Sequence, residues 1–224
     1  MWDGRVGIDL VPFSRVRKLL APGSERALYR LLTAEEIGIL RLPDDPDVEG
    51  IAGRLAAKEA VFKLFHLPGQ ALPWRGIEIL RGAGGWPEVR LSGRASELAA
   101  TVGIGHIEVS IAHDSPCAIA VAYSTCVSDR GKEKPTSLRA IEETDMPSAD
   151  IGEVREWILS RHPERQTIAA DENLIESRLV DSLSFVELVY AIEGASGAEI
   201  DFDNIELQDF QTLSAIEKAF FTVV

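Results

Sequence analysis

Gly53-Arg54-Leu55-Ala56-Ala57-Lys58-Glu59-Ala60-Val61-Phe62-Lys63 is the most informative stretch of this 224-residue sequence. Its apolar residues recur at helical spacing as far as Phe65, which predicts a helix over residues 50–66. Glu59 and Lys63 are four positions apart and therefore share one face of that helix. Spacing alone favours a solvated ion pair between them over a functional role.

A carboxylate occupies a strand-like segment near the N-terminus. The pattern predicts a strand over Val6–Val11, with Asp9 inside it, where a carboxylate needs a partner. If the fold brought Asp9 beside Glu59, the two could hold Mg²⁺, a cation that prefers oxygen ligands. Lys63 could then neutralise a phosphate. Together these residues would suit phosphoryl chemistry.

Helical and strand patterns alternate through the rest of residues 1–126. Thr33 and Glu36 match a capping box, which predicts that a helix begins there. The remaining predicted strands are Ile77–Leu80, Val89–Leu91, Ile107–Ile111 and Ala118–Tyr123, and the further helices are Phe13–Leu20, Thr33–Arg41 and Ser92–Thr101. This mixture indicates an α+β domain over residues 1–126.

The composition changes after residue 126. Residues 127–149 are polar and lack hydrophobic periodicity, so we predict a linker, which as a flexible chain would span roughly 26 Å. Residues 150–224 show only helical patterns, which predicts a small all-α four-helix domain. Its helices are expected at Ile151–Arg161, Leu183–Gly194, Ile205–Phe210 and Thr212–Phe221, and the second is expected to stop at Gly194 or Gly197.

The acidic charge is concentrated in the last third of the chain. The net charge is −13; residues 1–126 carry 15 acidic and 14 basic side chains, whereas residues 150–224 carry 16 and 5. We expect no nucleic-acid partner, because nucleic-acid binding requires a basic face. We also expect no membrane partner, since no apolar run reaches the ~20 residues of a membrane span. Cys117 and Cys126 match neither a zinc site nor a disulfide framework, which favours the cytoplasm.

The pair Asp181-Ser182 marks the start of the second C-terminal helix. Asp181 is a favourable N-cap, and Ser182 would then lie exposed in the first turn. A phosphodiester on Ser182 would be near the positive end of the helix dipole and its free N–H groups. The pair alone is explained equally well as an ordinary helix start.

The motifs of residues 4–124 follow one another in the order of a known enzyme family. They are Ile8-Asp9-Leu10-Val11 followed by Arg15, the segment Gly53–Lys63, Leu72-Pro73-Trp74 before Ile77-Glu78-Ile79, Pro87, and Val109-Ser110-Ile111-Ala112-His113-Asp114. This pattern resembles the small bacterial holo-acyl-carrier-protein synthases. The resemblance implies transfer of 4'-phosphopantetheine from coenzyme A to a serine of an acyl carrier protein. It also implies a homotrimer with active sites at the subunit interfaces.

The resemblance also implies roles for single residues. Asp9 and Glu59 would bind Mg²⁺ and, with Lys63, form the catalytic group. Contacts with coenzyme A are implied for Arg54, Lys58, Lys63, Ser110 and His113, and Arg15 would help to dock the acidic carrier protein. The base that accepts the serine proton is left open between Glu59 and a metal-held water.

Two segments depart from the family pattern, and both are expected near coenzyme A. Phe65-His66-Leu67-Pro68-Gly69 stands where a small glycine-rich turn is usual, and Gly85-Trp86-Pro87 stands where Gly-Lys-Pro is usual. His113, at the end of a predicted strand, could be a structural residue, a proton shuttle or a coenzyme A contact. The resemblance favours the contact.

The C-terminal third carries a second family pattern. Residues 179–189, then Ile192-Glu193, Ala198-Glu199-Ile200 and Phe210-Gln211-Thr212-Leu213, resemble an acyl carrier protein. The resemblance implies that Ser182 carries a covalent 4'-phosphopantetheine arm. It also implies that Glu187 and Glu193 lie on the acidic helix that partner enzymes, such as those of fatty acid or polyketide synthesis, recognise.

Together the two patterns predict a transferase at residues 1–126, a linker at 127–149 and its own carrier at 150–224. Modification would occur in cis or on a neighbouring subunit. One alternative is a carrier or scaffold protein whose transferase domain is inactive. Another is a double-length transferase, which would need a second copy of the metal-binding helix after residue 126, and the sequence contains none.

Overall fold

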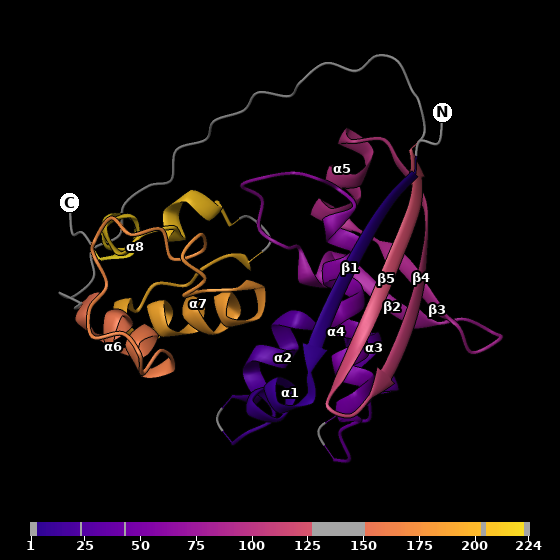
Figure 1. Ribbon diagram of the computed structural model, residues 1–224, viewed down its shortest axis with the longest axis horizontal. Helices are drawn as coiled ribbons and strands as arrows, with labels where there is room; N and C mark the ends of the chain where they lie inside the picture. Colours follow the sequence, from indigo (N-terminus) through magenta and orange to yellow (C-terminus); the bar gives the residue numbers. More distant parts are fainter. Residues whose placement is uncertain (1–3, 23, 43, 127–150, 203–204, 222–224) are drawn as a thin grey trace. The chain divides into compact units, whose positions relative to one another are not determined.

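The computed structural model describes residues 4–22, 24–42, 44–126, 151–202 and 205–221. Within that part of the chain, residues 4–68 and 72–126 form one compact unit, here called the N-terminal unit (Figure 1). Residues 151–202 and 205–221, with 69–71, form the second, the C-terminal unit. The predicted linker at 127–149 lies outside the described residues. No helix of the described segments is long and apolar enough to cross a membrane.

A three-stranded antiparallel sheet and one long helix form the centre of the N-terminal unit. The strands are β1 (Gly4–Pro12), β4 (Ile104–Asp114) and β5 (Cys117–Cys126), in the order β1-β5-β4. Helix α4 (Val48–Lys63) packs against all three strands (Figure 1). The approach is close, because a Cβ atom on Gly7 would overlap the carbonyl oxygen of Ala60. Small buried residues of β5, such as Ala120, line the same contact.

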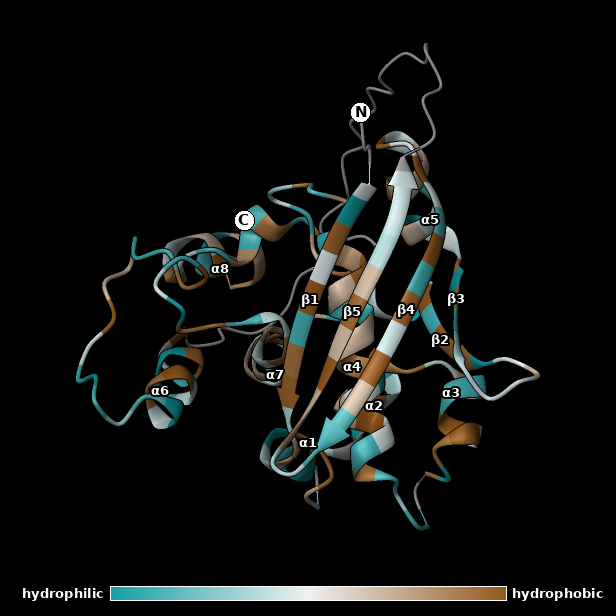
Figure 2. Cartoon of the chain, turned by 45° about the vertical axis from the view of Figure 1, so that its right-hand side comes forward, coloured by the Kyte–Doolittle hydropathy of each residue, from teal (hydrophilic) through white to brown (hydrophobic). Residues whose placement is uncertain are grey.

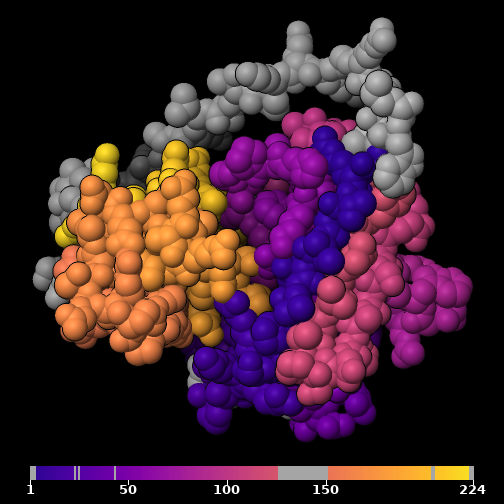
Figure 3. Space-filling model, in the orientation of Figure 1, coloured from indigo at the N-terminus to yellow at the C-terminus, as the bar shows by residue number. Residues whose placement is uncertain are grey.

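The register of the sheet separates its two faces. Asp9 pairs with Ala120, and Ala120 pairs with Ile111, so these residues share the face that α4 covers. On the other face, here called the outer sheet face, large apolar side chains are exposed. Figure 2 marks hydrophobic residues along β1 and β5 in brown. They are Val6, Ile8 and Leu10 of β1 and Ile119 and Val121 of β5. Figure 3 shows the side chains of β1, in indigo, beside pink β5 on this surface.

Shorter elements surround this centre. They are α1 (Phe13–Leu19), α2 (Glu25–Leu31), α3 (Ala34–Ile39), η1 (Trp74–Gly76), the hairpin of β2 (Ile77–Arg81) and β3 (Pro87–Leu91), and α5 (Gly93–Thr101). The predicted capping box is confirmed, since Thr33 and Glu36 exchange both of its hydrogen bonds at the start of α3. Helix α2 was not predicted. It is only 7 residues long, and its buried Leu28 and Leu31 pack into the core. The α+β character predicted for this part of the chain is confirmed.

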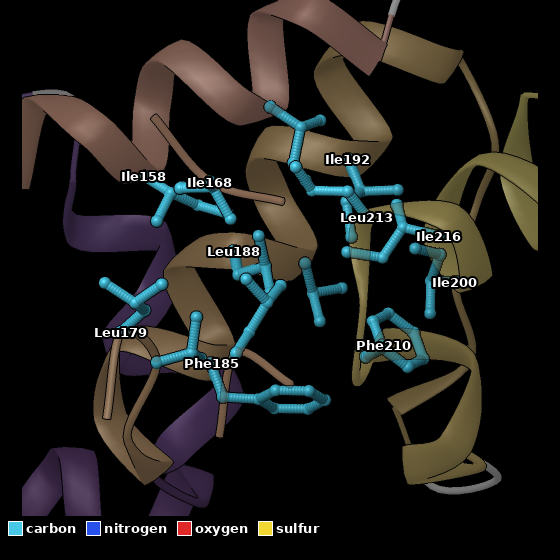
Figure 4. Close-up of a cluster of buried hydrophobic side chains, with 14 residues drawn as sticks. Ile158, Ile168, Leu179, Phe185, Leu188, Ile192, Ile200, Phe210, Leu213 and Ile216 are labelled. Carbon is cyan, nitrogen blue, oxygen red and sulfur yellow. The ribbon is translucent and has the colours of Figure 1, made fainter. Parts of the chain in front are cut away.

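The C-terminal unit is built from α6 (Ile151–Arg161), α7 (Ser182–Ser196), the 3₁₀ helix η3 (Leu207–Phe210) and α8 (Leu213–Phe220). Its core is an apolar cluster that includes Phe185 and Phe210 (Figure 4). The Phe210 ring makes an edge contact with Phe185 and a tilted contact with Phe220. No named strand falls within residues 151–202 and 205–221, which disagrees with a double-length transferase. Helix α7 ends at Gly197, whose φ of 74° is left-handed, so the alternative stop at Gly194 is wrong.

Candidate active site

The fold brings the three predicted catalytic side chains together. Asp9 points from β1 toward α4, where the Lys63 ammonium donates to Asp9 Oδ1 at 2.8 Å and to the Ile8 carbonyl at 3.0 Å. The same ammonium lies 3.8 Å from Glu59 Oε1. The exposed side-chain fractions are 13% for Asp9, 20% for Glu59 and 45% for Lys63. The site is therefore open to solvent on the lysine side, and the Glu59–Lys63 pair that spacing predicted also includes Asp9.

This carboxylate–lysine cluster suits a hard cation. Two carboxylates converge on one positive charge, and Mg²⁺ is commonly held by one or two carboxylates together with waters and substrate phosphates. No group of three or more histidine, cysteine, aspartate or glutamate side chains in the described segments could hold a metal. A cation at Asp9 and Glu59 would therefore take its other ligands from water or substrate, and Mg²⁺ is usually coordinated in this manner.

A cavity of about 290 Å³ lies on the same unit, with Arg54, Arg81 and His113 among its lining residues. The Arg54 guanidinium donates from Nε to the Ile79 carbonyl at 3.1 Å. Burial lowers the pKa of Arg54, but the group starts so high that it stays charged. His113 Nδ1 is 3.0 Å from Glu49 Oε2. The guanidinium groups of Arg54 and Arg81 are of the kind that bind phosphate, and the carboxylates of Asp47 and Glu49 also line the cavity.

The cluster and the cavity lie on one face of the sheet. Ile111 lines the cavity, and it stands in the same cross-strand row as Asp9, with Ala120 between them. Two strand spacings make the row about 10 Å long. Ala120, in the middle of the row, is fully buried beneath α4, so the packed helix separates the cavity from the carboxylates along this row.

Two residues predicted to contact coenzyme A lie neither in the carboxylate–lysine cluster nor among the residues that line the cavity. Ser110 pairs with Val121, so it stands on the outer sheet face, opposite to Ile111 and His113. Lys58 is fully buried, and its ammonium donates to Glu36 Oε2 and to the Trp74 carbonyl, both at 2.7 Å. The prediction for Lys58 is corrected on that ground, because a side chain enclosed in this way cannot touch a ligand.

The predicted docking residue Arg15 lies half-buried on α1. The exposed Arg17 and Lys18 follow it in the last turn of the same helix. This end of α1 is therefore basic, as docking of an acidic partner would require.

In the C-terminal unit, Ser182 is the first residue of α7. The predicted N-cap is confirmed: Asp181 Oδ1 accepts from the Leu183 and Ser184 N–H groups at 3.1 and 2.9 Å. Ser182 itself is half-buried, which is less exposed than the sequence suggested. Ser182 lies at the positive end of the α7 dipole, which favours a phosphodiester, although the Leu183 and Ser184 N–H groups of this turn already donate to Asp181.

Sequence analysis missed the partner of Glu187. Arg161, at the end of α6, donates from Nη2 to Glu187 Oε2 at 3.1 Å and lies 3.7 Å above the ring of Trp157. Glu193, also predicted for partner recognition, accepts from the Ile200 N–H at 2.9 Å. No short-range spacing could have revealed either contact, since both partners come from other segments of the unit.

The comparisons with known proteins concern the N-terminal unit. The family model "ACPS: 4'-phosphopantetheinyl transferase superfamily" matches residues 5–121. The chain is 37% identical over 119 residues to the holo-[acyl-carrier-protein] synthase of Desulforudis audaxviator, covering 53% of this chain and 90% of that protein. It is 38% identical over 116 residues to the enzyme of the same name from Moorella thermoacetica, covering 52% and 89%.

A crystal structure of the Helicobacter pylori holo-[acyl-carrier-protein] synthase, solved in complex with coenzyme A, is also similar. It is 30% identical, with a TM-score of 0.47, over 54% of this chain and all of that protein. The family model ends at residue 121, before the first helix of the C-terminal unit.

Proposed function

The chain belongs to the 4'-phosphopantetheinyl transferase superfamily, and we propose that its C-terminal unit is the carrier that its N-terminal unit modifies. The N-terminal unit is a holo-[acyl-carrier-protein] synthase, as its match to that family and to its curated relatives establishes. The observation that carries the proposed chemistry is the convergence of Asp9, Glu59 and Lys63 on one face of the sheet.

The donor in this proposal is coenzyme A. Arg54 and His113, which line the cavity, would bind its phosphates, and Lys63 would move its exposed ammonium from the carboxylates to the diphosphate. Asp9 and Glu59 would hold Mg²⁺, which when bound supplies positive charge against the diphosphate oxygens. Positioning and charge stabilisation would supply most of the rate, as in other phosphoryl transfers.

The acceptor is the hydroxyl of Ser182. Its oxygen would attack the phosphorus that bears the pantetheine arm, forming a new P–O bond while the bond to the adenosine 3',5'-bisphosphate oxygen breaks. The leaving bisphosphate keeps the electron pair of the broken bond, and the serine proton passes to a base. Glu59 is a candidate for that base, because its carboxylate is partly exposed beside Lys63. Asp181 would keep the first turn of α7 in place while the arm is attached.

The C-terminal unit would then carry acyl groups as thioesters of the arm on Ser182. Helical elements around one apolar core, with the serine at the start of α7, support this role. Glu187 would be one of the acidic side chains that partner enzymes, such as those of fatty acid or polyketide synthesis, recognise. A cytoplasmic location, expected from the two cysteines, stays a prediction.

The outer sheet face supports assembly of the N-terminal unit with further copies of the chain as a homotrimer. Five large apolar side chains exposed on two adjacent strands are unusual for a surface that faces water. Ser110 lies on the same face, so assembly would bring it to a neighbouring subunit, where it could contact coenzyme A. Analytical ultracentrifugation of the wild type and of Ile8→Glu tests this; a wild-type monomer would contradict it.

Intact mass spectrometry tests the proposed function. The arm-free protein, incubated with coenzyme A and Mg²⁺, should gain one phosphopantetheine arm, whereas Ser182→Ala and Glu59→Ala should gain none. Modification within the assembly further requires an initial rate per molecule that does not change on dilution. Gain by the wild type only after an unrelated transferase is added would instead identify a carrier attached to an inactive transferase.

A further inference from the structure

A fully buried ion pair lies outside the residues that the proposed reaction uses. Glu36 of α3 and Lys58 of α4 both have no exposed side-chain area, and their charged atoms are 2.7 Å apart. The Glu36 carboxylate accepts two further hydrogen bonds, one from the Thr33 N–H on Oε2 and one from the Ile79 N–H on Oε1, both at 2.9 Å. Each carboxylate oxygen therefore has a specific partner.

Ile79 connects this pair to the cavity. Its N–H donates to Glu36, and its carbonyl oxygen accepts from Arg54 Nε at 3.1 Å. In a strand, the N–H and C=O of one residue point to the same edge. The β2–β3 sheet has two strands, so the Glu36 and Arg54 side chains take the place of a third strand along the free edge of β2.

The bond to Ile79 fixes the orientation of the Arg54 guanidinium. Because the group is planar, pinning Nε also fixes the plane of the terminal N–H donors. A cationic group already held in one orientation loses less entropy when it binds an anion. Arg54 Nη1 also donates to the Gly50 carbonyl, at 3.4 Å, so the bond to Ile79 is the shorter of two anchors. Glu36 holds the Ile79 peptide from the other side.

We propose that Glu36 is a positioning residue, which acts through Ile79 to orient Arg54 for the phosphates of the donor. The proposal rests on the proposed function, because it concerns the same cavity. Lys58 lies one helical turn from Arg54 on α4, and its ammonium neutralises the buried Glu36 carboxylate. Glu36 thus combines the capping of α3 with the orientation of a ligand-binding arginine.

Glu36→Gln separates these two roles. The amide has a single acceptor oxygen, which Lys58 and the Thr33 N–H would retain, so its NH₂ group would face the Ile79 N–H. Thr33→Ala is the matched control, because it removes the hydroxyl that accepts from the Glu36 N–H but leaves every bond of the Glu36 carboxylate. Thr33→Ala therefore weakens the cap of α3 and leaves Ile79 held, whereas Glu36→Gln retains the cap and releases Ile79.

The measurements are the solvent exchange of the Arg54 Nε–H by NMR, assigned with Arg54→Lys, and the Kd for coenzyme A. In Glu36→Gln, we expect exchange at least about tenfold faster and a Kd raised about tenfold, equivalent to about 1.4 kcal/mol. Thr33→Ala should lower the thermal midpoint and change neither quantity. Unchanged exchange in Glu36→Gln, or equal changes in both variants, would overturn the proposal.

Two further outcomes can be distinguished: a wild type that does not bind coenzyme A, and a Glu36→Gln variant that does not fold. If the wild type fails to bind coenzyme A, the proposed function fails, but the exchange of the Arg54 Nε–H still reports whether Glu36 orients Arg54. If Glu36→Gln does not fold, the double variant Glu36→Leu/Lys58→Met replaces it, since it removes both buried charges together. That variant lacks the acceptor for the Ile79 N–H, so the same faster exchange is expected, and wild-type protection would contradict the proposal.

Discussion

Lys58 and Lys63 lie on the same helix, α4, and each is paired with a carboxylate from another element. The Lys58–Glu36 pair is fully buried, whereas Lys63 is 45% exposed beside Asp9 and Glu59. Burial lowers the pKa of Lys58 through loss of hydration, and the charge of Glu36 opposes that shift. Access to water therefore separates a structural lysine from one that can exchange its carboxylates for a ligand.

The largest expected effect is on stability at the buried pair. Lys58→Met leaves the Glu36 carboxylate buried without its counter-charge, so we expect a loss of about 3–5 kcal/mol in the free energy of unfolding. Lys63→Met removes an exposed ammonium and should cost about 1 kcal/mol or less. Urea unfolding of the two variants measures both. Equal losses would mean that burial is not what distinguishes the two lysines.

The second effect is on the reaction, at the exposed cluster. Glu59→Gln keeps the shape of the side chain but removes a charge from the carboxylate pair, so the transfer rate should fall by at least about 100-fold. Its unfolding free energy should change by about 1 kcal/mol or less. The control is Glu97→Gln on α5, where the side chain is also paired but lies in solvent. A comparable loss of rate in the control would remove the special role of Glu59.

A smaller effect is expected at the Arg161–Glu187 pair of the C-terminal unit. Arg161→Ala should lower stability by about 1 kcal/mol, because the two side chains are partly exposed, at 37% and 24%, and Arg161 also stacks on Trp157. If Glu187 docks the transferase, Glu187→Ala should slow arm attachment about fivefold while Arg161→Ala does not slow it. Rates from intact mass at limiting protein distinguish the two. If both variants slowed arm attachment equally, the effect would come from loss of the Arg161–Glu187 ion pair and not from docking by Glu187.

The smallest effect concerns pH. Desolvation, reinforced by the charge of Glu206, raises the pKa of Asp209 above its unfolded value of about 3.9. The folded C-terminal unit therefore binds this proton more tightly; the resulting stability is present below the unfolded pKa and is lost as pH rises through the folded pKa. Asp209→Asn should abolish this dependence and raise stability at neutral pH by a few tenths of a kcal/mol. An unchanged pH profile of unfolding would contradict the assignment.

Local patterns predicted the elements well where the signal spans few residues. The long helix, the strands and the caps at Thr33 and Asp181 depend on neighbours within one turn or on alternation, and the structure confirms them. Helix α2 was missed because its stability comes from packing of Leu28 and Leu31 rather than from a cap or a long period.

For the candidate active site, some predicted residues lie together in the structure and others do not. Resemblance brought together Asp9, Glu59 and Lys63, and the structure places them in contact. It also put Lys58 among the ligand contacts, although that side chain is enclosed. A sequence motif gives the order of residues along a helix, but the side that each faces depends on what packs there. Arg161 shows the same limit, since its partner Glu187 comes from a different helix.

The α+β character of the first half, the helical character of the last third and the helix starts could be read from the amino-acid sequence, because they follow from hydrophobic period and capping. The buried charges, the face of β4 that presents Ser110 and the carboxylate that supports Arg54 became known only from the packing of the folded chain. Those properties depend on burial and on contacts between segments distant in the chain, and desolvation acts only once the elements have packed.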